Sequence, residues 1–424
     1  MRWLLVLSLA AAMMPVGVAA KDCGDCASVP TQRPRPISRP RLIVLSDIGN
    51  EPDDQMSLVR LLLYSNDMDI EALVATTSTW QRNKASPEIM KAVIAAYGQV
   101  QANLMLHGQG WPSEAELDHK VFSGQSQYGL AATGPDKMTP GAQAIIDAAE
   151  RDDPRPLWVT IWGGANTLAQ ALLHVRDTRT PPELAKLVAK LHVISISDQD
   201  DAGPWIRHEF PQLFYIVKPS PPDSADYASA TWTGISGDIY YRIPGANTSL
   251  VTNQWLDKNI RSKGPLGAAY PKFAFIMEGD TPSFLGLIPT GLDAPEKPNW
   301  GGWGGRYIQR QPYGESHPIW TQGGDMFRRV TSADTVNGIT SDQATIWRWR
   351  QAYQHDFAAR MDWTIKGYAH ANHPPLIGPA TGQVTIVKAG QALTLRAPKV
   401  SDPDGHSLRY HWFVYAEAGL GDGN

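Results

Sequence analysis

The chain has 424 residues, of which 42% are hydrophobic and 19% are charged. That length exceeds what one ordinary hydrophobic core supports, so we expect a soluble globular protein with two domains. The formal net charge of -4 excludes a strongly basic surface, and we expect neither a nucleic acid polymer nor an anionic membrane as a partner.

The chain begins with an apolar stretch behind a single arginine, and residues 18–20 supply small side chains for cleavage. This pattern predicts a signal peptide over residues 1–20 and a secreted or periplasmic protein, with no membrane attachment after cleavage. Residues 21–40 are rich in proline and arginine and predict an extended linker. The two cysteines, Cys23 and Cys26, lie here, and we expect them to form a small-loop disulfide in an oxidising compartment.

Apolar runs of strand length alternate with segments of helical period from residue 41 onward. Strands are predicted within 41–47, 70–78, 156–164 and 190–198, and helices within 52–66, 86–100 and 166–177. The alternation predicts an α/β domain over residues 41–369, with a mostly parallel sheet covered by helices on both faces. A further long helix is predicted over 341–363 and closes this domain.

Two later regions differ from this pattern. Residues 289–322 are rich in Gly, Pro, Trp and Tyr and predict a long ordered loop over the mouth of a site, where Trp300 and Trp303 either stack on sugar rings or pack inward. Residues 370–424 show period-two alternation with turn signals. They predict an immunoglobulin-like β-sandwich domain that is incomplete.

Acidic residues follow three of the predicted strands. Ligands of parallel sheets bind beyond the carboxyl ends of the strands, so these acids are expected at one edge of the sheet. The stretch "IVLSDIGNEPDD" ends the first strand and opens the next helix, "ISISDQDD" ends another strand, and "KFAFIMEGD" a third. The acids are Asp47, Asp53, Asp54, Asp198, Asp200, Asp201, Glu278 and Asp280.

Clustered carboxylates repel one another and predict either a bound cation or an acid–base task. Oxygen ligands from several acids favour Ca²⁺ over Mg²⁺, and the lack of histidine and cysteine in the cluster argues against zinc. A bound dication lowers the pKa of its water, and a neighbouring carboxylate can take the proton. This chemistry suits hydrolysis at an anomeric carbon.

The order of these segments resembles the nucleoside hydrolases, whose N-terminal Asp-rich signature matches Asp47, Gly49, Asp53 and Asp54. "WGGANTLAQAL" and "MEGDTPS" resemble the second and third segments of that family. The resemblance implies a metal site and a set of residue roles. The metal ligands would be Asp47, Asp54, the carbonyl of Trp162, and Asp280 or, as the alternative, Glu278. Asp47 would also be the general base, and Asp53 would bind a sugar hydroxyl. Beyond the resemblance, we expect further substrate contacts from Asn83, Asn166, Asp200, Asp201, Glu209, Trp300 and Trp303.

The sequence departs from the nucleoside hydrolase pattern at four places. Leu45 replaces the first Asp of the signature, and three residues rather than one separate Gly49 from Asp53. Pro211 replaces an Asn in the substrate segment, and Gly279 replaces a His before Asp280. We therefore expect Glu278 to protonate the leaving group in place of that His.

Longer segments resemble a secreted bacterial family of nucleoside-hydrolase-like proteins that was named as cellulose-binding: "SDIGNEPDDQMSLVR", "SDQDDAGPWIRHEFP", "EGDTPSFLGLIP" and "WGGWGGRY". The resemblance implies a carbohydrate or glycoside partner. Three functions stay open. The first is a Ca²⁺-dependent hydrolase of glycosyl bonds, which are N-linked by resemblance to the family. The second is a non-catalytic carbohydrate-binding protein with a degenerate site. The third is a structural module in which the metal only stabilises the fold.

Overall fold

The computed structural model describes residues 39–221, 225–292, 294–327, 330–377, 388 and 390–419. The predicted signal peptide, nearly all of the linker and both cysteines lie outside these residues. Among the described helices, none combines the length and the apolar character that crossing a membrane requires.

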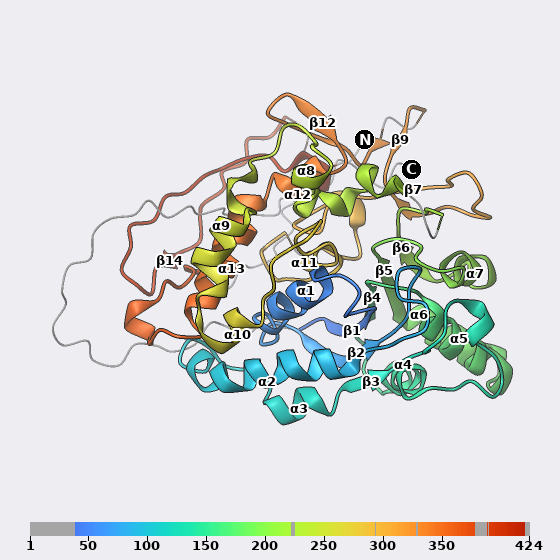
Figure 1. Cartoon of the computed structure of the whole chain (residues 1–424). Coiled ribbons are helices and arrows are strands. Elements are labelled where there is room, and N and C mark those ends of the chain that lie inside the picture. The colour runs from blue at the N-terminus through green and yellow to red at the C-terminus, as the bar shows by residue number, and fades with distance from the viewer. Residues whose placement is uncertain are drawn as a thin grey trace.

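An eight-stranded sheet forms the centre of the protein, in the order β3-β2-β1-β4-β5-β6-β8-β7 (Figure 1). Neighbouring strands are parallel except for the antiparallel pair of β7 and β8. The predicted α/β class is therefore confirmed. The strands are β1 Arg41–Ser46, β2 Asp69–Ala75, β3 Val121–Ser123, β4 Leu157–Ile161, β5 Leu191–Ser195, β6 Phe214–Ile216, β7 Ile308–Arg310 and β8 Ile319–Thr321.

Helices cover both faces of the sheet, because successive side chains of a strand point to opposite sides. In β1, Leu42 and Val44 pack into one core with α1 and α2, whereas Ile43 and Leu45 pack into a second core with α4–α7. The helices are α1 Asp53–Leu62, α2 Pro87–Leu104, α3 Glu114–Asp118, α4 Pro140–Glu150, α5 Asn166–Thr178, α6 Pro181–Lys190, α7 Ala202–Glu209, α8 Gly237–Tyr240, α9 Asn253–Leu256, α10 Gly264–Ala268, α11 Pro282–Leu285, α12 Ala344–Trp347 and α13 Arg350–Asp362.

Three predicted elements differ from the observed ones. The apolar run before Asp280 forms no strand, since β8 occupies the sheet position beside β6 and Glu278 has a positive φ of 58° that ends an extended run. The region predicted as one long loop contributes β7 and β8 as a hairpin. The predicted helix over 341–363 is divided into α12 and α13.

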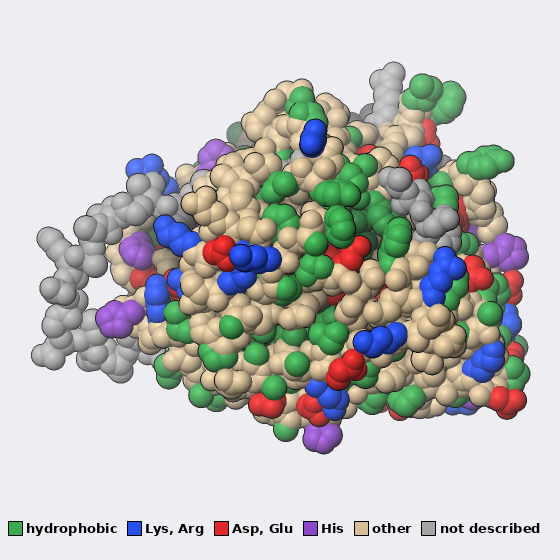
Figure 2. Space-filling view, in the orientation of Figure 1, with side chains coloured by type: hydrophobic (Ala, Val, Ile, Leu, Met, Phe, Trp, Pro, Cys, Tyr) green, Lys and Arg blue, Asp and Glu red, His purple; other side chains and the backbone are tan. Residues whose placement is uncertain are grey.

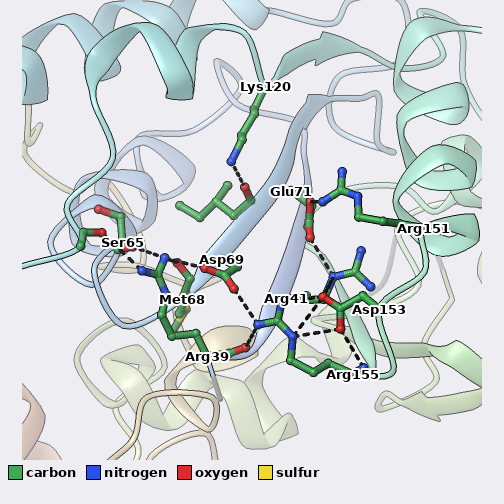
Figure 3. A network of polar contacts seen from close by, with 12 residues as sticks. Arg39, Arg41, Ser65, Met68, Asp69, Glu71, Lys120, Arg151, Asp153 and Arg155 are labelled. Carbon is green, nitrogen blue, oxygen red and sulfur yellow. Dashed lines mark hydrogen bonds and ion pairs between the residues drawn. The ribbon is translucent and has the colours of Figure 1, made fainter. Parts of the chain in front are cut away.

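Ion pairs join the amino ends of β1, β2 and β4 (Figure 3). The fully buried guanidinium of Arg41 donates to Glu71 at 2.7 Å and to the carbonyl of Ala148 at 2.7 Å. Arg155 pairs with Asp69 and with Asp153, both at 2.6 Å. At this end of the sheet the carboxylates therefore have arginine partners.

The region after residue 370 packs against the α/β domain. Within its described part, strands are limited to β13 (Leu376–Ile377) and β14 (Val400–Ser401), which pair antiparallel. Residues 378–387 of the predicted sandwich lie outside the described residues, so the immunoglobulin-like domain stays a prediction. Smaller antiparallel pairs precede this region: β9 Gly324–Asp325 with β10 Val330–Thr331, and β11 Asp334–Val336 with β12 Ile339–Ser341.

Two buried histidines attach the C-terminal region to the α/β domain. His107 Nε2 lies 2.8 Å from the carbonyl of Lys366, and its Nδ1 lies 2.8 Å from His373 Nε2. His373 Nδ1 in turn lies 2.8 Å from Asp404 Oδ1. The rings stack on one another and on Trp363. We call His107, His373 and Asp404 the histidine clasp.

The histidine clasp requires one more proton than two neutral imidazoles carry. The carbonyl and the carboxylate only accept, so both ring nitrogens facing them must be N–H groups, and the central bond needs a third proton. One ring is therefore an imidazolium. Burial lowers the pKa of His107, and Asp404 lies against the ring of His373. The other charged groups nearby are Asp402 and Lys366, whose ammonium pairs with Asp362.

The attachment of the C-terminal region is predicted to depend on pH. As pH falls through the lowered pKa of His107, the stability contributed by neutral His107 is lost. The protection of residues 399–406 against hydrogen exchange, taken relative to the intrinsic rate at each pH, should therefore decrease as pH falls through that pKa. Asp404→Asn should accelerate the exchange by on the order of tenfold, because a charge-assisted hydrogen bond is lost.

The matched control for this measurement is Ser407→Ala just after the same turn, since Ser407 is exposed and does not titrate. It should leave both the exchange rate and its pH profile unchanged. Equal protection in Asp404→Asn and the unchanged protein would contradict the charged clasp.

Candidate functional site

The order of the strands creates one crevice at the carboxyl edge of the sheet. From β1 the chain adds β2 and β3 on one side and then β4, β5 and β6 on the other. Connections therefore leave the ends of β1 and β4 in opposite directions, and ligands of such sheets bind at this point. Asp47 directly follows β1, and Trp162 directly follows β4.

Four buried or partly buried carboxylates gather at this crevice, and we call Asp47, Asp53, Asp54 and Asp280 the acid cluster. Asp53, Asp54 and Asp280 each offer an oxygen, and these oxygens lie within 4.8 Å of one another. Asp53 and Asp54 form the first turn of α1, where the helix dipole favours negative charge. Asp47 stands outside this trio, but its charge acts on all three members.

Burial is the main cause that raises the pKa of each acid in the cluster. It raises the pKa of Asp47 to about 6, and burial with the charges of Glu51 and Asp47 raises that of Asp53 to about 7. The pKa values of Asp54 and Asp280 also lie well above the ordinary range, through burial and then through neighbouring carboxylates. The charges that act most strongly on this cluster are thus other negative charges.

The acid cluster fits a hard dication. All of its donors are carboxylate oxygens, and Asp280 Oδ2 is buried without a hydrogen-bond partner. Such a buried oxygen is costly unless a cation or a donor satisfies it. Asp53, Asp54 and Asp280 would hold Ca²⁺, with Asp47 beside it. The carbonyl of Trp162 accepts from Gln199 Nε2 at 2.6 Å and keeps a second lone pair for the same role.

Short side-chain contacts fix the segments that carry the acids. Ser46 Oγ donates to Asp54 Oδ1 at 2.5 Å. The indole of Trp162 donates to Ser283 Oγ at 2.9 Å, and Ser283 Oγ donates to the carbonyl of Asp280 at 2.7 Å. The end of β4 is therefore tied directly to the segment that delivers Asp280.

Glu278 lies in a buried network behind the cluster. Both of its carboxylate oxygens face the guanidinium of Arg60, and they also accept from Tyr270 at 2.5 Å and Thr281 at 2.9 Å. Both oxygens of this fully buried carboxylate are thus already engaged by donors from Arg60, Tyr270 and Thr281. This geometry argues against the proton-donor role expected from the sequence and gives Glu278 a positioning role for Asp280.

Gly279 packs directly against the acid cluster. A Cβ built on it would lie 2.7 Å from Asp53 Oδ2 and 3.2 Å from the indole of Trp232. Any side chain here would therefore displace Asp53 or Trp232. A His at this position would therefore meet one of these two side chains.

The acids that follow β5 do not join the cluster. Asp200 accepts the N–H groups of Asn166 at 3.0 Å and Ala202 at 3.0 Å, so it joins the starts of α5 and α7. Burial raises its pKa to about 7. Asp201 accepts from the N–H of Leu130 at 2.7 Å, at the surface.

The strand-end acid Asp198 and two predicted substrate residues, Glu209 and Asn83, also lie elsewhere. Asp198 forms a bidentate pair with Arg207 at 2.8 and 2.9 Å. Glu209, at the far end of α7, pairs with Arg176 at 2.8 Å. Asn83 is exposed in the loop after β2. Of these residues, only Asn83 is free to turn toward a ligand.

The Gly-rich loop packs against the protein, and Trp300 and Trp303 are both partly buried. The ring of Trp303 lies 6.3 Å from that of Tyr353 in the core, and the backbone carbonyl of Trp300 accepts from Tyr415 at 2.6 Å. Of the two possibilities that the sequence left open for this loop, the ring contact favours inward packing for Trp303.

Several residues near the cluster were not found from the sequence: Ser46, Ser78, Gln199, Tyr227 and Trp232. Gln199 stands between two acids of "SDQDD", and this position was the available signal. Tyr227 and Trp232 belong to short 3₁₀ turns, Ala225–Ser229 and Thr231–Ile235, which have no periodic pattern. Only the tertiary structure brings them beside the acids.

Comparison with known proteins gives a consistent result. Residues 41–307 match a family model described as cellulose-binding Sde182, nucleoside hydrolase-like domain. The structure of a nucleoside hydrolase-related hypothetical protein from Saccharophagus degradans, described as associated with carbohydrate metabolism, is 34% identical with a TM-score of 0.74, over 90% of this chain and 87% of that chain. A plant nucleoside hydrolase, PpNRh1, is 13% identical with a TM-score of 0.38, over 77% of this chain and 99% of that chain. No curated protein matches.

Calcium is predicted to stabilise the protein most at alkaline pH. The raised pKa values of Asp47 and Asp53 mean that the metal-free folded state binds protons more tightly than the unfolded state. With chelator, the melting temperature should therefore rise as pH falls from about 8 to about 5. Saturating Ca²⁺ should raise it by several degrees at about pH 8 and by much less at about pH 5, because protons compete for the same oxygens.

Asp54→Asn should abolish this calcium response, while Asp201→Asn, outside the cluster, should keep it. Calorimetry of Ca²⁺ binding measures the same contrast directly. A calcium response that persists in Asp54→Asn would contradict the assignment of the metal ligands.

Gly279→Ala tests the steric constraint beside Asp53. The added methyl group must shift Asp53 or Trp232, and overpacking of this kind costs about 1–3 kcal/mol. Calcium affinity should fall by about tenfold or more. Gly367→Ala is the control, because its Cβ would meet no atom within 4 Å. Unchanged calcium affinity in Gly279→Ala would show that the contact is easily relieved.

Proposed function

Because the chain belongs to the nucleoside-hydrolase-like family of the cellulose-binding Sde182 domain, we propose that it is a Ca²⁺-dependent hydrolase of glycosyl bonds in carbohydrates or glycosides. The observation that carries this proposal is the buried acid cluster at the carboxyl ends of β1 and β4, whose strongest electrostatic neighbours are themselves acids. The apolar start of the chain, residues 1–20, supports export by a signal peptide.

The residues of the cluster would act on water and sugar as follows. A bound dication would supply a water of lowered pKa. The carboxylate of Asp47 would take a proton from the attacking water. The remaining negative charge of Asp53 and Asp54 favours the positive charge that develops at the anomeric carbon, and Asp53 also accepts from a sugar hydroxyl. N-glycosyl bonds are the first candidates by resemblance to nucleoside hydrolases.

A second function is favoured by a specific observation. Gly279 carries no side chain where nucleoside hydrolases have a His, and Glu278 is ion-paired with Arg60. A site without a group that protonates the leaving group suits carbohydrate binding without turnover, in line with the name of the family model. A substrate whose leaving group departs without protonation, such as a nitrophenyl glycoside, distinguishes the two functions, because a hydrolase without a proton donor can cleave it and a binding protein cannot.

Hydrolysis should depend on Asp47. The full chain is assayed with Ca²⁺ against nitrophenyl glycosides, cello-oligosaccharides and inosine. Asp47→Asn should lower kcat by about 10²–10⁴-fold, the usual contribution of a general base. Glu209→Gln, which changes a distant carboxylate, should match the unchanged protein. Oligosaccharide binding without hydrolysis of any of these substrates would favour the non-catalytic function.

A further inference from the structure

Aromatic side chains from separate segments surround the acid cluster. One group comprises Trp80, Tyr227 and Trp232, with ring centroids 6.5 Å apart for Trp80 and Tyr227 and 5.5 Å for Tyr227 and Trp232. A second group comprises Tyr240, Tyr241 and Phe275, with centroids 4.9 Å apart for the two tyrosines and 5.5 Å for Tyr240 and Phe275. We call them the first and the second aromatic group.

The first aromatic group is linked to the acids by direct contacts. The indole of Trp232 borders Gly279, next to Asp53. The backbone N–H of Trp80 donates to Ser78 Oγ at 3.0 Å, and Ser78 hydrogen-bonds to Asp47. The charge of Asp47 also acts on the phenol of Tyr227.

The second aromatic group adjoins both the first group and the cluster, since Tyr227, Glu51 and Asp53 all act electrostatically on the phenol of Tyr241. Its outer members are exposed, Tyr240 by 50% and Phe275 by 46%. Trp80 of the first group is 49% exposed. Figure 2 shows acidic atoms near the middle of this face with hydrophobic side chains around them.

The rings meet one another by their edges, with interplanar angles of 70°, 65°, 77° and 84° along the two groups. The exposed members, Trp80, Tyr240 and Phe275, offer ring surface that can receive the C–H face of a sugar ring. Trp232 Nε1 and Gln199 Oε1 are buried without hydrogen-bond partners. One donor and one acceptor of this kind match the hydroxyl groups of a sugar.

We propose that the two aromatic groups are neighbouring sugar-binding subsites beside the acid cluster, and that the ligand is an oligosaccharide of at least two rings. A free nucleoside offers a single base to stack, whereas two adjoining aromatic groups with exposed members, Trp80 in one and Phe275 in the other, offer positions for more than one ring. This inference rests on the proposed function, because it names the substrate class of the same site.

Fluorescence titration of the full chain tests the subsites, with cellohexaose, xylohexaose and laminarihexaose as probes. The Asp47→Asn background is used so that binding is measured without turnover. At least one hexasaccharide should bind, and Trp80→Ala and Phe275→Ala should each weaken that binding by about tenfold, the loss expected for one aromatic contact. Tyr313→Ala is the control, since Tyr313 is a fully exposed aromatic on the β7–β8 hairpin.

The outcomes separate the subsites from the proposed function. Binding that depends on Trp80 and Phe275, in a protein that hydrolyses nothing, would keep the subsites and overturn the hydrolase. Absence of binding to all three hexasaccharides, or equal binding in Trp80→Ala, Phe275→Ala and Tyr313→Ala, would overturn the subsites. Displacement of the hexasaccharide by a lower concentration of inosine would overturn the preference for an oligosaccharide.

Discussion

The repulsion among buried carboxylates at the end of β1 is the constraint on which this site depends. The same strand begins at Arg41, where acids of the neighbouring strands and loops have arginine partners, and is followed by Asp47, whose strongest electrostatic neighbour is another acid. A fold that neutralises charge at one edge of its sheet could do so at the other. The unneutralised edge therefore marks the place where an external positive charge belongs.

The acid cluster keeps its geometry because an ion pair and uncharged side chains hold the segments that carry the four acids. Arg60 and Glu278 join α1 to the segment before α11, and Trp162 joins β4 to that segment through Ser283. These contacts compensate for the absence of a strand beneath Asp280, since an irregular segment has no ladder of backbone hydrogen bonds to fix it. Gly279 packs against Asp53, so position 279 has no space for a catalytic side chain. The site therefore has carboxylates that suit a metal but no side chain at position 279 to protonate a leaving group.

The aromatic surroundings and the acids complement each other chemically. Carboxylates and a dication recognise hydroxyl groups, and aromatic faces recognise the apolar side of a sugar ring. The family to which the chain belongs, and the carbohydrate association of its 34% identical relative, agree with such a ligand. The leaving group and the length of the ligand are decided by the residues around the cluster.

The sequence by itself determined the parallel sheet, its first strands and helices, and the places of Asp47, Asp53 and Asp54. Continuous apolar runs and helical periods act locally, and the carboxyl ends of parallel strands share one edge wherever the pattern occurs. Only the tertiary structure decided which acids meet. It pairs Asp198 with Arg207, places Glu209 at the far end of α7, and brings Asp280 to the cluster without a strand. These outcomes depend on contacts between residues far apart in the chain, for which no local period exists.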